Sequence, residues 1–364
     1  MSAVSLSSPG VQALLVEARS RTDAVVAPLL ERVDPEAAGV LAYQWGWRGT
    51  RGELVAGGGR GKAVRAALVF AAARATGDGP GSEDDPLVRA GAAAVEVLHT
   101  LSLLHDDVMD GDALRRGRPA AWKVFGADVV ESAVRALTPD ALELAFRDVL
   151  GVSGRPGIAP PRLAGAARAT GLLGDALVRL AQGQALDLAL EEEARCDTAT
   201  ILRVHADKTG SLFACACALG AAPEAAGDLA VFGENLGIAF QIVDDVLGLW
   251  GDPAVMGKPA GADLTARKKS YPVAVALSGE GTRHDVAGTG RLRELYARPE
   301  PWTLEQAGEV RRLLDGSGAR GVAEAAARAH ERRALDALAR ACPPSRKAGD
   351  DLRALAAFVT GRAY

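Results

Sequence analysis

The stretch PLVRAGAAAVEVLHTLSLLHDDVMD, residues 86–110, predicts the fold of this chain. Helix-forming residues fill it, and apolar residues occupy most positions before its acidic end. A helix that is apolar on every side is normally buried in a protein interior. Its acidic end holds Asp106 and Asp110, which are four residues apart and therefore share one helical face. We expect a buried helix whose carboxylates open onto the floor of a cavity.

The composition of the 364 residues also favours helices over sheets. Hydrophobic residues make up 48%, which is enough for a large core. Aromatic residues make up only 4%, and Ala and Leu dominate over Val and Ile, which favours helix. The net charge of −4 gives no global positive field, so we expect no nucleic-acid partner.

Cysteine usage and hydropathy indicate a reducing compartment. The four cysteines form no CxxC pair and are expected to be buried thiols. The N-terminus has no signal-peptide pattern, and charges or glycines interrupt every apolar run before about 18 residues. We therefore expect a cytoplasmic protein with no stable membrane span.

Helical patterns follow one another along the chain. Thr138 and Pro139 have the residue types of a helix N-cap and first turn, so we expect a helix to begin there. No Gly/Pro-rich break is long enough for a domain linker, and we predict a single all-α domain over residues 1–364, a helical bundle around a deep central cavity. The other expected helices cover residues 10–34, 61–77, 86–110, 162–192, 197–220, 224–250, 271–279, 304–315, 320–341 and 348–362.

A second acidic motif, QIVDDVL at residues 241–247, resembles the first in its apolar surroundings. Clustered carboxylates repel one another and resist burial unless a cation joins them, and Mg²⁺ prefers such oxygen ligands. A lone motif of this kind is more often a solvated helix end. Two acid pairs that each end an apolar stretch point instead to several magnesium ions, which could hold a diphosphate.

Basic residues accompany the acidic motifs. The run GGGRGK, residues 57–62, precedes an expected helix, where glycines and a helix N-terminus can accept an anion, although a flexible linker is an equal alternative. Lys62 and Arg65 are three residues apart and would share a face. The run DALRRGRP, residues 112–119, directly follows the first acid cluster.

These motifs together resemble the trans-isoprenyl diphosphate synthases, or polyprenyl synthetases, over nearly the whole chain. The resemblance implies an all-α prenyltransferase, similar to geranylgeranyl diphosphate synthases and usually dimeric. It would elongate an allylic diphosphate (dimethylallyl, geranyl or farnesyl) with isopentenyl diphosphate, using Mg²⁺. The matching stretches are residues 61–65 (GKAVR), 99–110 (HTLSLLHDDVMD), 114–119 (LRRGRP), 125–126 (FG), 183–187 (GQALD), 208–210 (KTG), 240–245 (FQIVDD) and 257–264 (GKPAGADL).

The resemblance assigns two neighbouring substrate sites. Three Mg²⁺ ions between the acid clusters would neutralise the charge that grows on pyrophosphate as an allylic diphosphate ionises. The expected metal ligands are Asp106, Asp107, Asp110, Asp244 and Asp245. The expected contacts of the allylic diphosphate are Arg115, Lys208, Thr209, Gln241 and Lys258. The expected isopentenyl diphosphate pocket consists of Lys62, Arg65, His99 and Arg116, although His99 alone would also be ordinary as a helix histidine.

The sequence departs from the family pattern at three places. After Phe125 and Gly126, residues 136–142 (ALTPDAL) replace the usual AGDAL segment and indicate a small insertion. Ala63 follows Lys62 where an Arg is usual, and Gly248 stands where the third acid of the second motif is usual. Asp252 lies eight residues after Asp244, a spacing similar to the second motif of class I terpene cyclases. A cyclase is therefore the enzymatic alternative, and a catalytically degenerate structural or regulatory subunit is the non-enzymatic one.

The residues just before the first acid cluster predict the product length. Leu101 and Ser102 lie five and four residues before Asp106, where a bulky aromatic would stop chain growth. Helical rise puts Leu101 about 7.5 Å below the diphosphate site. We expect growth beyond 15 carbons, to geranylgeranyl diphosphate with 20.

Overall fold

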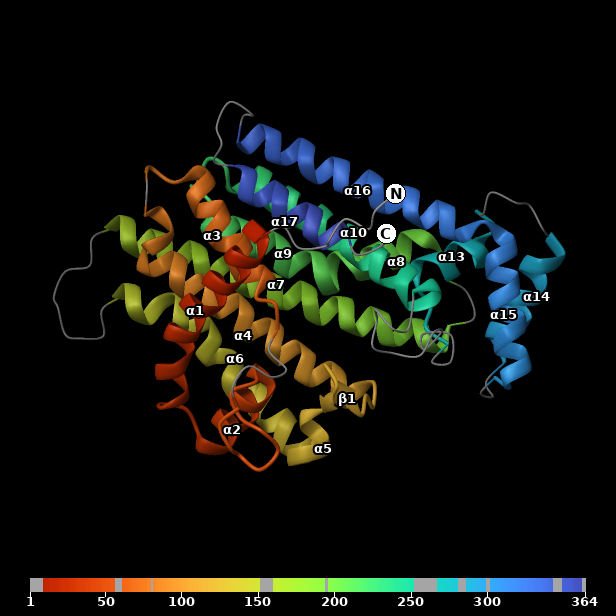
Figure 1. The fold of residues 1–364 in the computed structure, drawn as a ribbon, viewed down its shortest axis with the longest axis horizontal. Coiled ribbons are helices and arrows are strands. Elements are labelled where there is room, and N and C mark those ends of the chain that lie inside the picture. Colours follow the sequence, from red (N-terminus) through yellow and green to blue (C-terminus); the bar gives the residue numbers. More distant parts are fainter. Residues whose placement is uncertain are drawn as a thin grey trace.

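Helices make up nearly all of the regular structure of the computed structural model (Figure 1). The structure describes residues 9–55, 61–79, 81–150, 160–193, 196–251, 267–280, 286–298, 302–342 and 349–361. Its α-helices are α1 (Pro9–Leu30), α2 (Pro35–Trp45), α3 (Val64–Thr76), α4 (Pro86–Met109), α5 (Ala121–Phe125), α6 (Ala127–Leu150), α7 (Pro160–Glu192), α8 (Thr198–Val204), α9 (Ser211–Gly220), α10 (Ala226–Trp250), α13 (Tyr271–Ser278), α14 (Val286–Ala297), α15 (Leu304–Ser317), α16 (Ala319–Ala341) and α17 (Asp350–Thr360). The expected all-α fold is confirmed.

Helix α4 begins and ends where its sequence predicts. The side chain of Asp85 accepts the amide of Leu87 at 2.7 Å, and Pro86 occupies the first turn, where its missing N–H costs nothing. Of the described helices, only α4 is long and apolar enough to cross a membrane, and most of its apolar window is buried inside the protein. The apolar residues of α4 therefore serve the core, and the helix delivers the first acid cluster at its C-terminal end.

Helix α10 joins the two apolar clusters of the described chain. Its first half contributes Phe232 and Leu236 to a cluster built with α1–α4, α6, α9 and α17. Its second half contributes Ile242 and Val246 to a cluster built with α8 and α13–α16. Helix α16 lies along α10, and α14 and α15 form one end of the molecule (Figure 1). The second acid cluster is thereby fixed on a helix that is packed on most sides.

The prediction that a helix begins at Thr138 is wrong. Helix α6 runs through Pro139, and the hydroxyl of Thr138 donates back to the carbonyl of Val134 at 2.7 Å instead of capping a new helix. Leu137 and Ala141 are fully buried on its inner face. Packing on both sides of the proline outweighs the loss of one helical hydrogen bond.

The helix expected over residues 197–220 is present, but one turn in its middle is π-helical instead of α-helical. Helices α8 and α9 are separated by one π-helical turn, His205–Gly210, which carries Lys208 and Thr209. Short π-helical segments inside α-helices occur often at functional sites, because the extra residue changes the direction of neighbouring side chains.

A two-stranded hairpin follows the first acid cluster. Strands β1 (Leu114–Arg115) and β2 (Arg118–Pro119) pair antiparallel, so Arg116 and Gly117 form the two-residue turn. Both turn residues have positive φ, 53° and 73°, as this kind of tight hairpin requires. The turn separates Arg115 from Arg116 and lets the two side chains reach different neighbours.

Candidate active site

The three aspartates of the first acid cluster have different surroundings. Asp107 is only 1% exposed and accepts a hydrogen bond from Nε of Arg115 at 2.7 Å. Arg115 also lies 3.4 Å from Asp112 in the same loop. Asp106 lies on the side of Lys208 and Asp110 is exposed. Asp107 therefore fixes the hairpin, while the other two carboxylates face the site.

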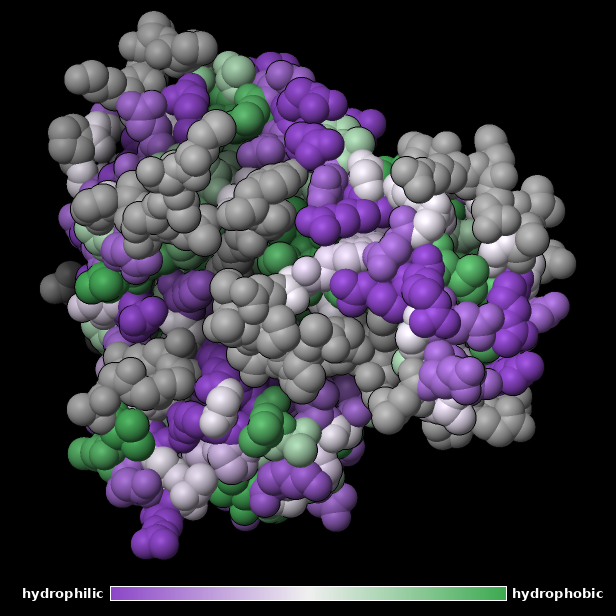
Figure 2. Space-filling view, turned by 45° about the vertical axis from the view of Figure 1, so that its right-hand side comes forward, coloured by the Kyte–Doolittle hydropathy of each residue, from purple (hydrophilic) through white to green (hydrophobic). Residues whose placement is uncertain are grey.

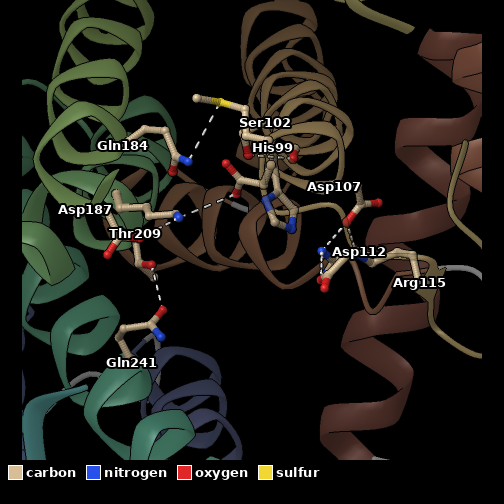
Figure 3. Close-up of polar contacts among 12 residues, drawn as sticks. His99, Ser102, Asp107, Asp112, Arg115, Gln184, Asp187, Thr209 and Gln241 are labelled. Atoms are coloured by element: carbon tan, nitrogen blue, oxygen red, sulfur yellow. Dashed lines mark hydrogen bonds and ion pairs between the residues drawn. The ribbon is translucent and has the colours of Figure 1, made fainter. Parts of the chain in front are cut away.

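Lys208 connects the first acid cluster to α7. Its Nζ lies 2.9 Å from Oδ2 of Asp187 on α7 and 3.9 Å from Oδ2 of Asp106 on α4. The hydroxyl of the neighbouring Thr209 donates to Oε1 of Gln241 on α10 at 2.9 Å. Figure 3 shows Asp187, Thr209 and Gln241 on one side of the end of α4, with Asp107 and Arg115 on the other. Four elements far apart in sequence thus meet at this point.

Negative charge exceeds positive charge at this side of the site. Burial raises the pKa of Asp106, the carboxylates of Asp110 and Asp187 raise it further, and Lys208 and Arg115 only partly offset them. The pKa of Asp110 is also raised, by burial first and then by neighbouring carboxylates. A group of carboxylates whose anionic forms are unfavourable in the protein alone is suited to bind an added cation.

The two aspartates of the second motif also differ. Asp244 is exposed on α10, whereas Asp245 is 1% exposed. Oδ2 of Asp245 accepts the backbone N–H of Tyr271 at 2.9 Å and lies 3.0 Å from Nε2 of His205. Burial alone would raise the pKa of Asp245, but His205, Lys268 and the Tyr271 amide together lower it. Asp245 therefore joins α10 to the π-helical turn and to α13.

The basic pocket lies about two helical turns before the acid cluster along α4, at Glu96, His99 and Thr100. A small cavity there is lined by residues of α1, α2, α4, the segment before α3 and the hairpin, namely Arg19, Thr22, Gln44, Trp45, Gly61, Ala63, Glu96, His99, Thr100 and Arg116. A Cβ at Gly61 would lie 2.9 Å from Nη2 of Arg116, so the glycine permits the close approach of this arginine. Arg65 stacks its guanidinium 4.8 Å from the ring centre of Phe213, and Lys62 places its ammonium 5.4 Å from that of Phe358.

The charges around His99 make this pocket suited to an anion. Burial lowers the pKa of His99 well below its usual value, and Arg65, Arg116 and Arg115 lower it further. Burial also lowers the pKa of Arg65 to about 10, partly offset by Glu96. A neutral imidazole among three guanidinium groups can donate a hydrogen bond without adding charge. A diphosphate would supply the negative charge that the pocket lacks.

The residues expected to set product length lie directly below the acid cluster. Leu101 is 2% exposed within the first apolar cluster, and the hydroxyl of Ser102 donates to the carbonyl of His99. Lys258 and Asp252, by contrast, fall outside the described residues. Gly248, in the described part of α10, offers no acid to the second motif.

Three residues of the site received no role from the sequence. Asp187 belonged to a matching motif, and its spacing of four from Gly183 could have indicated a shared helical face. Arg179 lies one turn before Gly183 on the same face, which was a weaker signal of the same kind. His205 gave no signal, because only the fold shows that its ring meets Asp245.

The described residues do not form a complete metal-binding site by themselves. Nowhere within the described ranges do three His, Cys, Asp or Glu side chains converge closely enough to hold an ion. Mg²⁺ commonly takes one or two carboxylates and completes its shell with water and substrate phosphate. Asp106 and Asp110, four residues apart at the end of α4, could supply such carboxylates.

An all-α fold with two aspartate motifs, a lysine between helices and an adjoining arginine pocket defines a class of helical transferases that act on diphosphates. The sequence profile of the family described as "Polyprenyl synthetase" matches residues 55–305. The chain belongs to this family and is a prenyltransferase.

Similar proteins extend this result over the full length. A geranylgeranyl diphosphate synthase of Mycobacterium tuberculosis is 37% identical over 96% of this chain and 94% of its own. A (2E,6E)-farnesyl diphosphate synthase of Mycobacterium bovis is 35% identical, over 92% and 88%. The crystal structure of a polyprenyl synthetase from Streptomyces coelicolor A3(2) superposes with a TM-score of 0.82 at 35% identity, covering 96% of this chain and 99% of that one.

Proposed function

We propose that this prenyltransferase condenses isopentenyl diphosphate with dimethylallyl, geranyl or farnesyl diphosphate, head to tail, and releases geranylgeranyl diphosphate. One observation carries the proposal: the acid site and the arginine pocket share helix α4. Asp106 and His99 are seven residues apart, which places them about 10 Å apart along the axis on one face. Two diphosphates held at this separation would bring their prenyl groups together.

The acid site would bind the allylic diphosphate. Asp106 and Asp110 from α4 and Asp244 from α10 would hold the three Mg²⁺ ions of this proposal. Bound Mg²⁺ would neutralise charge on the departing pyrophosphate. We narrow the expected ligand set, because Asp107 and Asp245 are buried and already engaged with Arg115 and with His205, respectively. These two carboxylates would orient the groups around the metals.

Basic and polar side chains of the protein would complete the pyrophosphate site. Lys208, placed between two carboxylates, would turn to the added phosphate oxygens, and Arg115 would contact the same group from the hairpin. Thr209 and Gln241 would donate hydrogen bonds from the opposite helices. Lys258 stays a prediction in this set, outside the described residues.

The arginine pocket would bind isopentenyl diphosphate. Lys62, Arg65 and Arg116 would neutralise its phosphates, and His99 would donate to a phosphate oxygen. The double bond would then attack the allylic cation, and the released pyrophosphate would accept the proton that leaves. No protein side chain needs to act as the base.

The names of the relatives support a short product, since they are geranylgeranyl and farnesyl diphosphate synthases. Leu101 and Ser102 favour the longer of the two, because neither blocks the region below the acid site as an aromatic would. The depth of the central cavity stays a prediction.

We also propose a single-domain, cytoplasmic homodimer. On the face shown in Figure 2, apolar side chains form separate patches among polar ones. Helix α7 exposes Leu163 and Val178 at 49% and 57%, so it offers apolar surface to a second copy.

Release of pyrophosphate tests the proposed reaction. The protein is incubated with Mg²⁺ and isopentenyl diphosphate, with each allylic diphosphate, and with both together. We expect release only when both substrates are present, and none from Asp106→Asn. A terpene cyclase would release pyrophosphate from an allylic diphosphate alone, and a degenerate subunit would release none in any mixture.

A further inference from the structure

The π-helical turn that carries Lys208 lies between matching faces of α7 and α10. On α7 the contacts come from Arg179, Gly183 and Asp187, spaced four residues apart and therefore on one face. A Cβ at Gly183 would lie 2.6 Å from the backbone nitrogen of Lys208, so α7 and the turn touch backbone to backbone. Asp187 then meets the lysine side chain at 2.9 Å.

Helix α10 supports the turn from the other side. Glu234, Gly237 and Gln241 are spaced three and four residues apart and also share a face. A Cβ at Gly237 would lie 2.7 Å from Cα of Gly210, at the end of the turn. Gln241 accepts the hydrogen bond of Thr209. The two glycines leave room for the turn, but they make no directional bond that would fix its position.

Arg179, on α7, supplies directional bonds to the π-helical turn and to α10. Its Nε donates to Oδ1 of Asp207 at 2.8 Å, and its Nη2 donates to Oε1 of Glu234 at 2.6 Å and to the carbonyl of Ala206 at 3.3 Å. Asp207, whose side chain is 13% exposed, directly precedes Lys208. A displacement of Asp207 would therefore displace the backbone from which the lysine projects.

The charges at this contact favour one fixed position of the π-helical turn relative to α7 and α10. Arg179 presents a rigid fork, with one branch on the turn and one on α10. Burial alone would lower the pKa of Arg179, but Asp207 and Glu234 together outweigh burial and raise it. Such partly buried, charge-assisted hydrogen bonds are stronger and more directional than exposed ion pairs.

We propose that Arg179 is a positioning residue that holds the π-helical turn in register, so that Lys208 and Thr209 face the pyrophosphate site. This inference rests on the proposed function and deepens it. Arg179 touches neither substrate, because its bonds go to Asp207, Ala206 and Glu234. Its effect therefore reaches the site through Lys208 and Thr209 and should spare the isopentenyl diphosphate pocket.

The test compares Arg179→Gln, Arg179→Lys and a control, Arg291→Gln. Arg291 makes a similar forked pair with Glu309 at 2.7 and 3.1 Å, but between α14 and α15 at the far end of the molecule (Figure 1). Initial rates would be measured while each diphosphate is varied in turn. For Arg179→Gln we expect KM for the allylic diphosphate to rise about tenfold and KM for isopentenyl diphosphate to stay within about twofold. Arg179→Lys should recover part of the loss, and the control should match the parent.

Calorimetric binding of inorganic pyrophosphate with Mg²⁺ separates this inference from the proposed reaction. We expect Arg179→Gln to weaken that binding about tenfold even if the parent turns over no substrate. Parent-like binding and parent-like KM in Arg179→Gln would overturn the positioning role while leaving the reaction intact. An equal rise of both KM values would also overturn it, since that result indicates a general loss of structure.

A double variant tests whether misfolding, instead of the lost contact, explains the weaker binding of pyrophosphate. Asp207→Asn breaks the same contact from the turn. If Arg179 acts through Asp207, the double variant should bind pyrophosphate no more weakly than either single variant. Additive losses would contradict the proposal.

Discussion

At the scale of single residues, each acidic pair combines an accessible carboxylate with a buried one. Asp106 lies beside Lys208 and Asp244 is exposed, whereas Asp107 and Asp245 are both 1% exposed and accept hydrogen bonds from protein donors. Adjacent residues on a helix point about 100° apart, so one residue of such a pair can reach the site while the other reaches a neighbouring helix.

The second pair provides a direct comparison. Asp245→Asn should lower the free energy of unfolding by about 3 kcal/mol, because it leaves His205 and the Tyr271 amide facing a weaker acceptor. Asp244→Asn should leave thermal unfolding unchanged and lower kcat by about a hundredfold or more. Thermal unfolding without ligands and initial rates measure both effects. Equal unfolding temperatures for the two variants would contradict the assignment.

The sequence was sufficient to find these acids but not to distinguish their roles. The spacing of Asp106 and Asp110 follows from helical periodicity alone. The burial of Asp107 depends on Arg115, which reaches it only because the hairpin turns at Arg116 and Gly117. The contact between His205 and Asp245 joins residues 40 apart on different helices, so no local pattern predicts it.

At the scale of elements, the π-helical turn depends on close approach by α7. Gly183→Ala would place a methyl group 2.6 Å from the backbone nitrogen of Lys208. We expect kcat/KM for the allylic diphosphate to fall between about tenfold and a hundredfold, since small displacements of binding groups are costly. Gly171→Ala, on the same helix with nothing within 4 Å of the new carbon, should keep full activity and gain up to about 1 kcal/mol of stability. Steady-state rates and thermal unfolding distinguish the two, and a parent-like Gly183→Ala would refute the close approach.

The packing of α16 on α10 predicts a pH dependence of stability. Nδ1 of His330 lies 2.9 Å from Oδ1 of Asn235, and burial, together with the charges of Arg333 and His205, lowers the pKa of His330 to about 4. The unfolded chain takes up this proton below its ordinary value near 6.5, so the histidine destabilises the folded protein as the pH falls from about 6.5 to about 4. The loss should reach about 2 kcal/mol at pH 5.

Unfolding followed between pH 7.5 and 5 tests this dependence. His330→Gln should lose less stability over that range than the parent. His105→Gln, which changes an exposed histidine, should follow the parent. Parallel curves for all three proteins would contradict a lowered pKa of His330.

Helical periodicity predicted most elements, but it did not predict α2 or α14, and it misjudged three local features. Pro139 was expected to start a helix, yet packing of Leu137 and Ala141 carries α6 through it. The short hairpin was not anticipated, because four strand residues give too little alternation. No local pattern in HADKTG, residues 205–210, marks a π-helical turn, and its close contacts with α7 and α10 appear only in the fold.

At the scale of the whole molecule, α4 joins the acid site and the arginine pocket to the apolar interior. Its acid end lies beside Lys208, His99 lines the arginine pocket, and Leu101 lies within the core. The all-α class followed from composition and period. The meeting of α4, α7 and α10 at Lys208 did not, because it depends on how distant segments pack.

Product length should respond to the volume below the acid site. Leu101→Phe should shorten the main product from 20 carbons to 15 or fewer, since the ring would occupy the path of the growing chain. Leu103→Phe is the matched control, because two residues turn the side chain by roughly 200° around the helix. Chromatography of the dephosphorylated products measures both. An unchanged product from Leu101→Phe would remove Leu101 from the wall of the path.

The central claim is that this protein joins two diphosphate substrates head to tail. Its most direct test follows carbon-labelled isopentenyl diphosphate into product, with Mg²⁺ and each allylic diphosphate, by mass spectrometry of the intact product. The account predicts a 20-carbon diphosphate that carries one label for every five-carbon unit added. An unlabelled hydrocarbon or alcohol formed from the allylic substrate alone would contradict it.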